Sequence, residues 1–364
     1  EEIKRLELDF VIICGDLTKD GEDLSHRQLA EKLKSLTSVG TSVYVVPGNH
    51  DVNNPEAKRY NGDETEPVPT VSPKEFEEIY HQYGYSTALH KDPDSLSVVV
   101  EPVPGLWLFA LDSCRYRENL ENQHHIVDGT FSHDTLLWIE QKLIEAIQQE
   151  KAVIGFLHHG VLEHYNSNEH HYGDYLLDDF QYISEMLAAY GMRFIFSGHF
   201  HAQDITLKKW SESDIENHFL FDIETGSLVT YPVPWRMIQT SNQEMSIISS
   251  RIESIDSHPN DFQGFARDFV RQGTILLADE ALTGYGVPEE DQMLLSPQIA
   301  EAYIAHIQGD EITPDPILDL TGLSPIGLGV IALQGSLIEG WFNDLLPADN
   351  EIVINMTEGE VSSE

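Results

Sequence analysis

Four short polar motifs, each directly after a run of apolar residues, constrain the fold of this 364-residue chain more than any other feature. The runs are rich in β-branched and aromatic residues, which is typical of buried strands in a sheet with parallel neighbours. Because ligand sites in α/β sheets lie where strands end, we expect the motifs to meet at one site. In chain order, the motifs are Gly15-Asp16, Gly48-Asn49-His50-Asp51, His158-His159 and Gly198-His199-Phe200-His201.

These motifs contain the side chains that a pair of divalent transition metals requires. Imidazole nitrogens suit such ions, a carboxylate can bridge two of them, and an amide oxygen adds a neutral ligand. Asp16 is the natural bridging carboxylate, because it is the acid at the end of the first strand. A two-residue step in extended backbone would place His199 and His201 on the same side, so that one short segment serves both ions. The motifs therefore predict a two-metal hydrolase site.

The order of the motifs resembles that of the calcineurin-like metallophosphoesterases. That family carries D-x-H, GD, GNH[D/E], H and GHxH in sequence, and all but the first occur here. Glu224-Thr225-Gly226-Ser227 and residues 231–236 resemble the bacterial branch related to cyclic-nucleotide phosphodiesterases. The resemblance implies an α/β fold, a four-layer αββα sandwich of two mixed sheets, which a small C-terminal helical domain would follow.

The resemblance also implies roles for individual residues. His50 would be the general acid that protonates the leaving oxygen, Asp51 would orient it, and a metal-bridging hydroxide would be the nucleophile. His158 is preferred to His159 as a ligand, because it lies directly at the strand end, and His159 would line the pocket. The cofactors would be two divalent transition metals (Mn, Fe or Zn), bound by Asp16, Asn49, His158, His199 and His201.

A small phosphodiester, perhaps a cyclic nucleotide, is the preferred substrate, and the preference for a diester rests on the resemblance alone. A phosphomonoesterase with the same site is the first alternative. A non-catalytic interaction platform is the second, although such a scaffold has no chemical need for His50. A nuclease is a fourth hypothesis, which the acidic composition disfavours.

The net charge of −41 is extreme for this length and bears on possible partners. Nucleic-acid polymers and anionic membranes are disfavoured, because binding them requires clusters of Lys and Arg. An anionic phosphoester would approach against this field unless bound metals reverse the local potential. No apolar run is long enough to span a bilayer.

The sequence begins with residues that resemble the last turns of a helix, at residues 1–8, before the strand that ends at Cys14. The family's D-x-H strand would precede them, so we expect one metal site to be half-empty in this chain. Asp256-Ser257-His258 is the one D-x-H present, and we interpret it as a linker. Localisation is left open.

Composition changes near residue 257 divide the chain into three expected parts. These are a catalytic domain at 1–256, a helical domain at 257–350 and an acidic tail at 351–364. Residues 53–73 are polar and rich in Pro and Glu, which predicts a flexible insert. Phe262, Phe265 and Phe269 fall at helical spacing and are expected in a core.

Several further side chains could be functional or merely structural. A histidine-rich loop carries His164, His170 and His171, which would be solvated or contact the substrate, as would His124 and His125. Cys14 and Cys114 are interpreted as small buried side chains, because two cysteines form neither a disulfide framework nor a Cys-based zinc site.

Overall fold

The computed structural model describes residues 3–210, 218–241 and 243–362. It divides into two compact units by the density of contacts along the chain. Unit 1 comprises residues 1–162, 173–199 and 208–222. Unit 2 comprises residues 163–172, 200–207 and 223–364.

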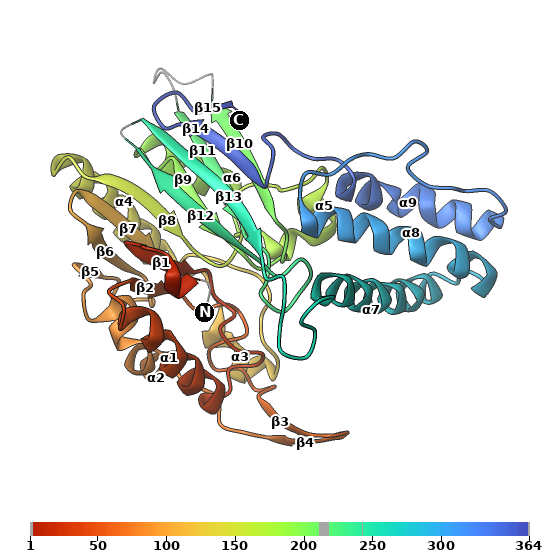
Figure 1. Cartoon of the computed structure of the whole chain (residues 1–364), viewed down its shortest axis with the longest axis horizontal. Coiled ribbons are helices and arrows are strands. Elements are labelled where there is room, and N and C mark those ends of the chain that lie inside the picture. Colours follow the sequence, from red (N-terminus) through yellow and green to blue (C-terminus); the bar gives the residue numbers. More distant parts are fainter. Residues whose placement is uncertain (1–2, 211–217, 242, 363–364) are drawn as a thin grey trace. The chain divides into compact units, whose positions relative to one another are not determined.

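The strands that carry the four motifs form where the sequence predicts them (Figure 1). β1 (Phe10–Ile13) pairs in parallel with β2 (Ser42–Val45). A seven-stranded sheet has the order β10-β11-β9-β8-β7-β6-β5, and β7, β8 and β9 are parallel neighbours. Its strands are β5 (His90–Lys91), β6 (Val98–Val103), β7 (Leu106–Ala110), β8 (Ala152–Phe156), β9 (Phe194–Ser197), β10 (Asp204–Trp210) and β11 (His218–Glu224).

Amphipathic helices bury the core of unit 1. Ser132 caps α4, because its hydroxyl accepts a hydrogen bond from the Thr135 N–H at 3.1 Å. Ile139 and Leu143 of α4 and Leu187 of α6 are fully buried in a cluster with strand residues. The helices described here are α1 (Asp23–Thr37), α2 (Pro73–Ile79), α3 (Tyr116–Asn122), α4 (His133–Gln148) and α6 (Phe180–Ala189), with short helical turns at Ile3–Arg5, His81–Tyr85 and Gly173–Tyr175.

The polar insert at residues 53–73 contains regular structure that its composition did not predict. β3 (Lys58–Asn61) and β4 (Glu64–Pro67) form an antiparallel hairpin. Both strands are exposed along their length, so they lack the apolar alternation that marks a half-buried strand.

The end of the chain does not form the expected acidic tail. β14 (Glu351–Asn355) pairs with β13 (Glu244–Arg251), and β15 (Glu360–Ser362) extends the same antiparallel sheet beyond β14. β12 (Pro234–Thr240) completes this sheet on the other side of β13. Ile352 and Ile354 are buried, whereas Val353 between them is half-buried, and this short β-branched run is the strand signal that the acidic composition obscured.

The predicted C-terminal helices are present, and they share unit 2 with the β12–β15 sheet. Figure 1 shows α7 (Phe262–Gly284), α8 (Glu289–Gln308) and α9 (Pro325–Trp341), which pack in succession; α5 (Asn168–Tyr172) belongs to the same unit. None of the described helices is long and apolar enough to cross a membrane.

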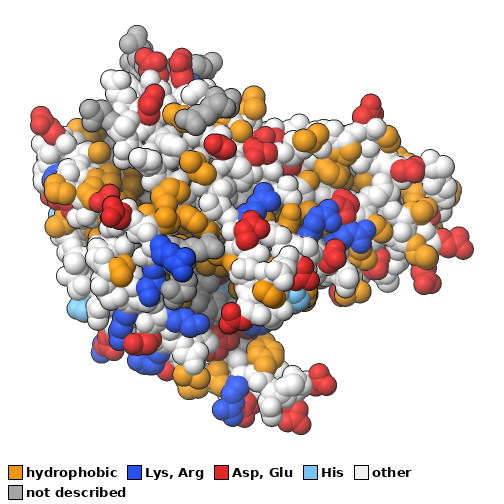
Figure 2. Space-filling view, viewed as in Figure 1, with side chains coloured by type: hydrophobic (Ala, Val, Ile, Leu, Met, Phe, Trp, Pro, Cys, Tyr) orange, Lys and Arg blue, Asp and Glu red, His pale blue; other side chains and the backbone are white. Residues whose placement is uncertain are grey.

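One expectation about these helices is wrong. Phe262 is buried, but Phe265 is 45% and Phe269 69% exposed. The buried residues of α7 include Ala266, Ala278 and Leu282. Only the first of the three phenylalanines therefore contributes to the core, and the other two lie on the exposed side of the helix. Figure 2 shows apolar side chains exposed among acidic ones on these helices.

Asp222 on β11 joins the segment after β8 to the end of β9 through buried hydrogen bonds. Its buried carboxylate accepts hydrogen bonds from the N–H groups of Val161 and Leu162 at 2.6 and 3.1 Å and from the Ser197 hydroxyl at 2.6 Å. We expect Asp222→Ala to lower the free energy of unfolding by about 3 kcal/mol, because three buried donors lose a charged acceptor. Urea denaturation measures this loss. The exposed Asp178→Ala is the control, and equal effects of the two changes would contradict the account.

Candidate active site

The parallel pairing of β1 and β2 brings the first two motifs together. Ile13 is the register partner of Val45, so Asp16 and Gly48 each follow three residues later. A Cβ on Gly48 would lie 2.1 Å from Asp16 Oδ1, which explains why this position is glycine. Asp16 itself has a φ of +50°, which is an uncommon backbone conformation for a non-glycine residue.

His158 is oriented by a backbone carbonyl. Its Nδ1 lies 2.7 Å from the carbonyl oxygen of Cys14, which can only accept a hydrogen bond, so Nδ1 carries the proton. In the neutral ring, Nε2 therefore bears a lone pair. Nε2 lies 3.0 Å from Asn49 Oδ1 and 3.5 Å from Asp16 Oδ2. Three acceptor atoms thus face one another, an arrangement that is repulsive unless a cation lies between them.

His199 adds a further candidate metal ligand to this group. One ligand atom from each of Asp16, His158 and His199 lies within 4.8 Å of the others. The His199 ring is 7% exposed and stacks on Tyr175, with ring centroids 4.3 Å apart. A carboxylate, an amide oxygen and two imidazoles are a donor set that fits divalent transition metals.

His201 lies two residues further on and belongs to unit 2. It is half-buried and has a φ of +69°, and His199 has a φ of +77°. The expectation of an extended two-residue step between them is therefore wrong, since both residues adopt the left-handed region. The proposed role of His201 as a ligand rests on the family motif.

His159 is held by two other groups. Its Nε2 donates to the carbonyl oxygen of Val127 at 2.8 Å, and its Nδ1 accepts from the Ser113 hydroxyl at 2.7 Å. Burial lowers the pKa of His159 to about 3, so the ring is neutral. With both nitrogens engaged, it fits the wall of the site better than a metal ligand.

Asp51 joins the first two motif loops. Its carboxylate accepts hydrogen bonds from the N–H groups of Gly48, Leu17 and Thr18 at 2.8 to 3.0 Å. Burial raises the pKa of Asp51, while His26 and these N–H groups oppose the rise. The Asp51 carboxylate therefore stabilises the conformation of the two motif loops.

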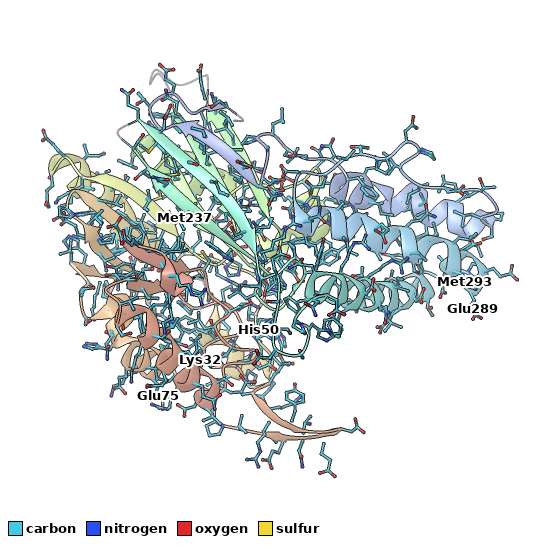
Figure 3. All side chains as sticks on the ribbon, viewed as in Figure 1. Lys32, His50, Glu75, Met237, Glu289 and Met293 are labelled. Atoms are coloured by element: carbon cyan, nitrogen blue, oxygen red, sulfur yellow. The ribbon has the colours of Figure 1, made fainter. Side chains whose placement is uncertain are left out.

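His50 is accessible and has an acidic neighbour that the sequence did not reveal. Its side chain is 31% exposed, and its Nδ1 lies 3.4 Å from Asp20 Oδ1. Its ring also lies against His125, with centroids 4.2 Å apart, and His125 contacts Glu56. Figure 3 labels His50 in the loop that follows β2. No motif marks Asp20 or Glu56, although Asp20 lies only four residues after Asp16 in the same loop.

The remaining candidate side chains are distributed differently from the expectation. Of the three histidines in this loop, His170 is exposed, His171 is half-buried and lies 2.8 Å from the Ser336 hydroxyl, and His164 is buried.

Cys14 and Cys114 are thiols that contact carbonyl oxygens, and burial raises the pKa of Cys114 well above its usual range. His258 stacks on Phe265 in a local turn, as expected of a linker.

The strand-end motifs and the converging donors are those of a metal-dependent phosphoester hydrolase. A family model described as calcineurin-like phosphoesterase matches residues 1–203, more than half of the chain. The chain belongs to the calcineurin-like phosphoesterase family, whose members use two metals. No curated protein matches this chain. It is similar to a solved dimetal phosphatase from Danio rerio (LOC 393393), with 13% identity over 69% of this chain and 83% of that chain, but the TM-score of 0.43 is too low to support any conclusion.

The adjacent histidines provide a matched pair for testing the ligand assignment. We expect His158→Gln to lose bound metal, because the substitution removes the nitrogen that faces Asp16 and Asn49. His159→Gln should keep its metal and lower the free energy of unfolding by about 1–3 kcal/mol, since two buried hydrogen bonds are disturbed. Elemental analysis after loading with Mn²⁺ and desalting measures the difference. Retention of the full metal content by His158→Gln would contradict the assignment.

Proposed function

We propose that the protein hydrolyses a small phosphodiester, such as a cyclic nucleotide, at the site formed by the four motifs. The observation that carries this proposal is the convergence of His158 Nε2, Asn49 Oδ1 and Asp16 Oδ2, which are all acceptors when the His158 ring carries its proton on Nδ1. Such a group is costly to bury unless a cation neutralises it. Because the chain belongs to a family of phosphoesterases, the cation is assigned to phosphoester hydrolysis.

The chain's own residues would hold two divalent transition metals, one at a nearly complete site and one at a site for which they supply only part of the ligands. The residues proposed for this role are Asp16, Asn49, His158, His199 and His201. When bound, the metals supply positive charge for the phosphoryl oxygens and lower the pKa of a bound water. That positive charge also offsets the field of a chain with a net charge of −41, which would otherwise repel an anionic substrate.

His50 is proposed as the general acid. Its Nδ1 faces Asp20, so Nε2 is the atom that can meet a leaving oxygen. The imidazolium would transfer the Nε2 proton to that oxygen and become neutral, while Asp20 holds the Nδ1 proton in place. Partial exposure of the ring leaves it accessible to a substrate.

Asp20 therefore takes over the positioning role that the resemblance gave to Asp51. The carboxylate of Asp51 is fully buried and accepts from backbone groups of the two motif loops. Asp20 is 6% exposed and lies between two basic side chains, because it also contacts Lys19.

The preference for a diester rests on the resemblance of residues 224–227 and 231–236 to the phosphodiesterase branch. In unit 2, the Arg236 guanidinium donates to the carbonyl oxygens of Glu224 and Asp204, so this segment has a structural role there. Hydrolysis rates for bis-p-nitrophenyl phosphate and p-nitrophenyl phosphate separate the two substrate classes. We expect faster turnover of the diester, and a reversed preference would identify a phosphomonoesterase.

The acid role of His50 is tested by leaving-group dependence. We expect His50→Gln to reduce turnover of an alkyl ester by about 10²–10⁴-fold, because a poor leaving group needs a proton. A p-nitrophenyl ester should be affected much less, since nitrophenolate leaves without one. Metal content should not change, and exposed His133→Gln on α4 is the control. An equal loss for both esters would exclude the acid role.

A comparison of Asp20→Asn with Asp51→Asn tests which carboxylate positions His50. Asp20→Asn should lower turnover of the alkyl ester by about tenfold or more and leave thermal stability nearly unchanged. Asp51→Asn should lower the melting temperature, because an amide nitrogen would face backbone N–H groups. The hypothesis fails if Asp20→Asn affects alkyl and nitrophenyl esters equally.

A further inference from the structure

Unit 2 contains a second group of metal-type donors, separate in residues from those of the motifs. Asp204 begins β10, His306 lies in the last turn of α8, and Glu311 is in the segment that follows α8. One ligand atom from each lies within 4.8 Å of the others. Asp204 is 1% exposed, and the side chains of His306 and Glu311 are 1% exposed each.

Two atoms of this group are buried without a hydrogen-bond partner among the described residues. His306 Nδ1 lies 2.8 Å from Glu311 Oε1, but His306 Nε2 and Glu311 Oε2 have no partner. A buried carboxylate oxygen and a buried imidazole nitrogen without partners are costly to a folded protein. A bound cation would give such buried atoms a partner.

The charge around the group is strongly negative. Asp310, Asp344 and Asp349 form an adjoining cluster whose ligand atoms also lie within 4.8 Å of one another. Asp344 Oδ1 is likewise buried without a partner. Arg236 lies beside these acids, and its guanidinium donates to backbone carbonyl oxygens, including that of Asp349.

Burial, together with Glu311 and Asp204, raises the pKa of Asp344 to about 7, and burial raises the pKa of Asp349 well above its usual range. Carboxylates crowded in this way either take up protons or bind a cation. The imidazole of His306 favours a bound metal over protonated carboxylates, because its second nitrogen, which makes no hydrogen bond, is a good metal ligand.

We propose that Asp204, His306 and Glu311 bind a divalent transition-metal ion, Zn²⁺ or Mn²⁺, which has a structural role in unit 2. One imidazole with two carboxylates suits these ions better than Ca²⁺ or Mg²⁺, which prefer oxygen ligands. Ligands at about 2.1 Å from one ion lie no more than about 4.2 Å apart, so small shifts of the side chains complete the site.

The surroundings of Asp204 resemble those of a metal ligand. His164 Nδ1 donates to Asp204 Oδ1 at 2.6 Å, and the Thr206 hydroxyl donates to the same oxygen at 3.1 Å. Partners of this kind fix the orientation of a carboxylate that binds a metal. The ion would join the start of β10 to the end of α8 and the segment after it.

The test uses the chain in which Asp16→Asn, His158→Gln and His199→Gln remove three of the four ligands proposed for unit 1, so that zinc bound there does not enter the count. This variant is loaded with Zn²⁺ alone, desalted and submitted to elemental analysis. We expect about one zinc per chain, and a melting temperature that rises when Zn²⁺ is added. Absence of bound zinc would overturn the proposal and leave protonated carboxylates as the explanation of the cluster.

The ligands are then tested in the same background. His306→Gln with Glu311→Gln should reduce the zinc content to nearly none and abolish the thermal shift. Glu301→Gln on α8, which removes an ion pair with Arg267 and Arg271 at the surface, is the matched control and should keep the zinc. Should the double substitution fail to fold, the nearly isosteric Glu311→Gln alone should still weaken zinc binding at least tenfold. Unchanged zinc affinity in that variant would contradict the proposed ligand set.

Discussion

The hydrogen bond from His158 Nδ1 to the carbonyl oxygen of Cys14 determines the chemistry of the site. It assigns the proton of the imidazole to one nitrogen and turns the other, as an acceptor, toward Asn49 and Asp16. The bond joins the ends of two strands that are far apart in sequence, so the strand order of unit 1 is needed to form it. This arrangement favours a bound cation, because a positive charge among converging acceptors removes their mutual repulsion.

Close approach of the backbone segments after β1 and β2 stabilises this arrangement. The register of β1 with β2 places Gly48 against Asp16, where a side chain has no room. Asp51 then accepts hydrogen bonds from both loops and keeps them together. The proposed ligand groups are therefore positioned by strand ends and buried hydrogen bonds, whereas His50, the proposed acid, lies partly exposed beside Asp20.

The sequence predicted the motif-bearing strands because apolar runs followed by polar motifs are a strong local signal. It also predicted the helices of the C-terminal part, where apolar residues recur at helical spacing. It could not reveal Asp20, because the contact with His50 depends on loop conformation and no motif marks it. The left-handed conformation of His199 and His201 was missed for the same reason, and an acidic composition obscured β14, in which two isoleucines are buried. Contacts between distant segments, such as that of Asp204 with His306 and Glu311, leave no local pattern at all.

The proposed site requires a metal ion among Asp16, Asn49, His158 and His199. Anomalous diffraction at the manganese edge, from crystals of the chain loaded with Mn²⁺, locates such an ion. We expect an anomalous peak within coordination distance of His158 Nε2, Asn49 Oδ1 and an Asp16 carboxylate oxygen. Density that instead shows the Asn49 amide nitrogen donating to His158, with no anomalous peak beside Asp16, would contradict the proposed site.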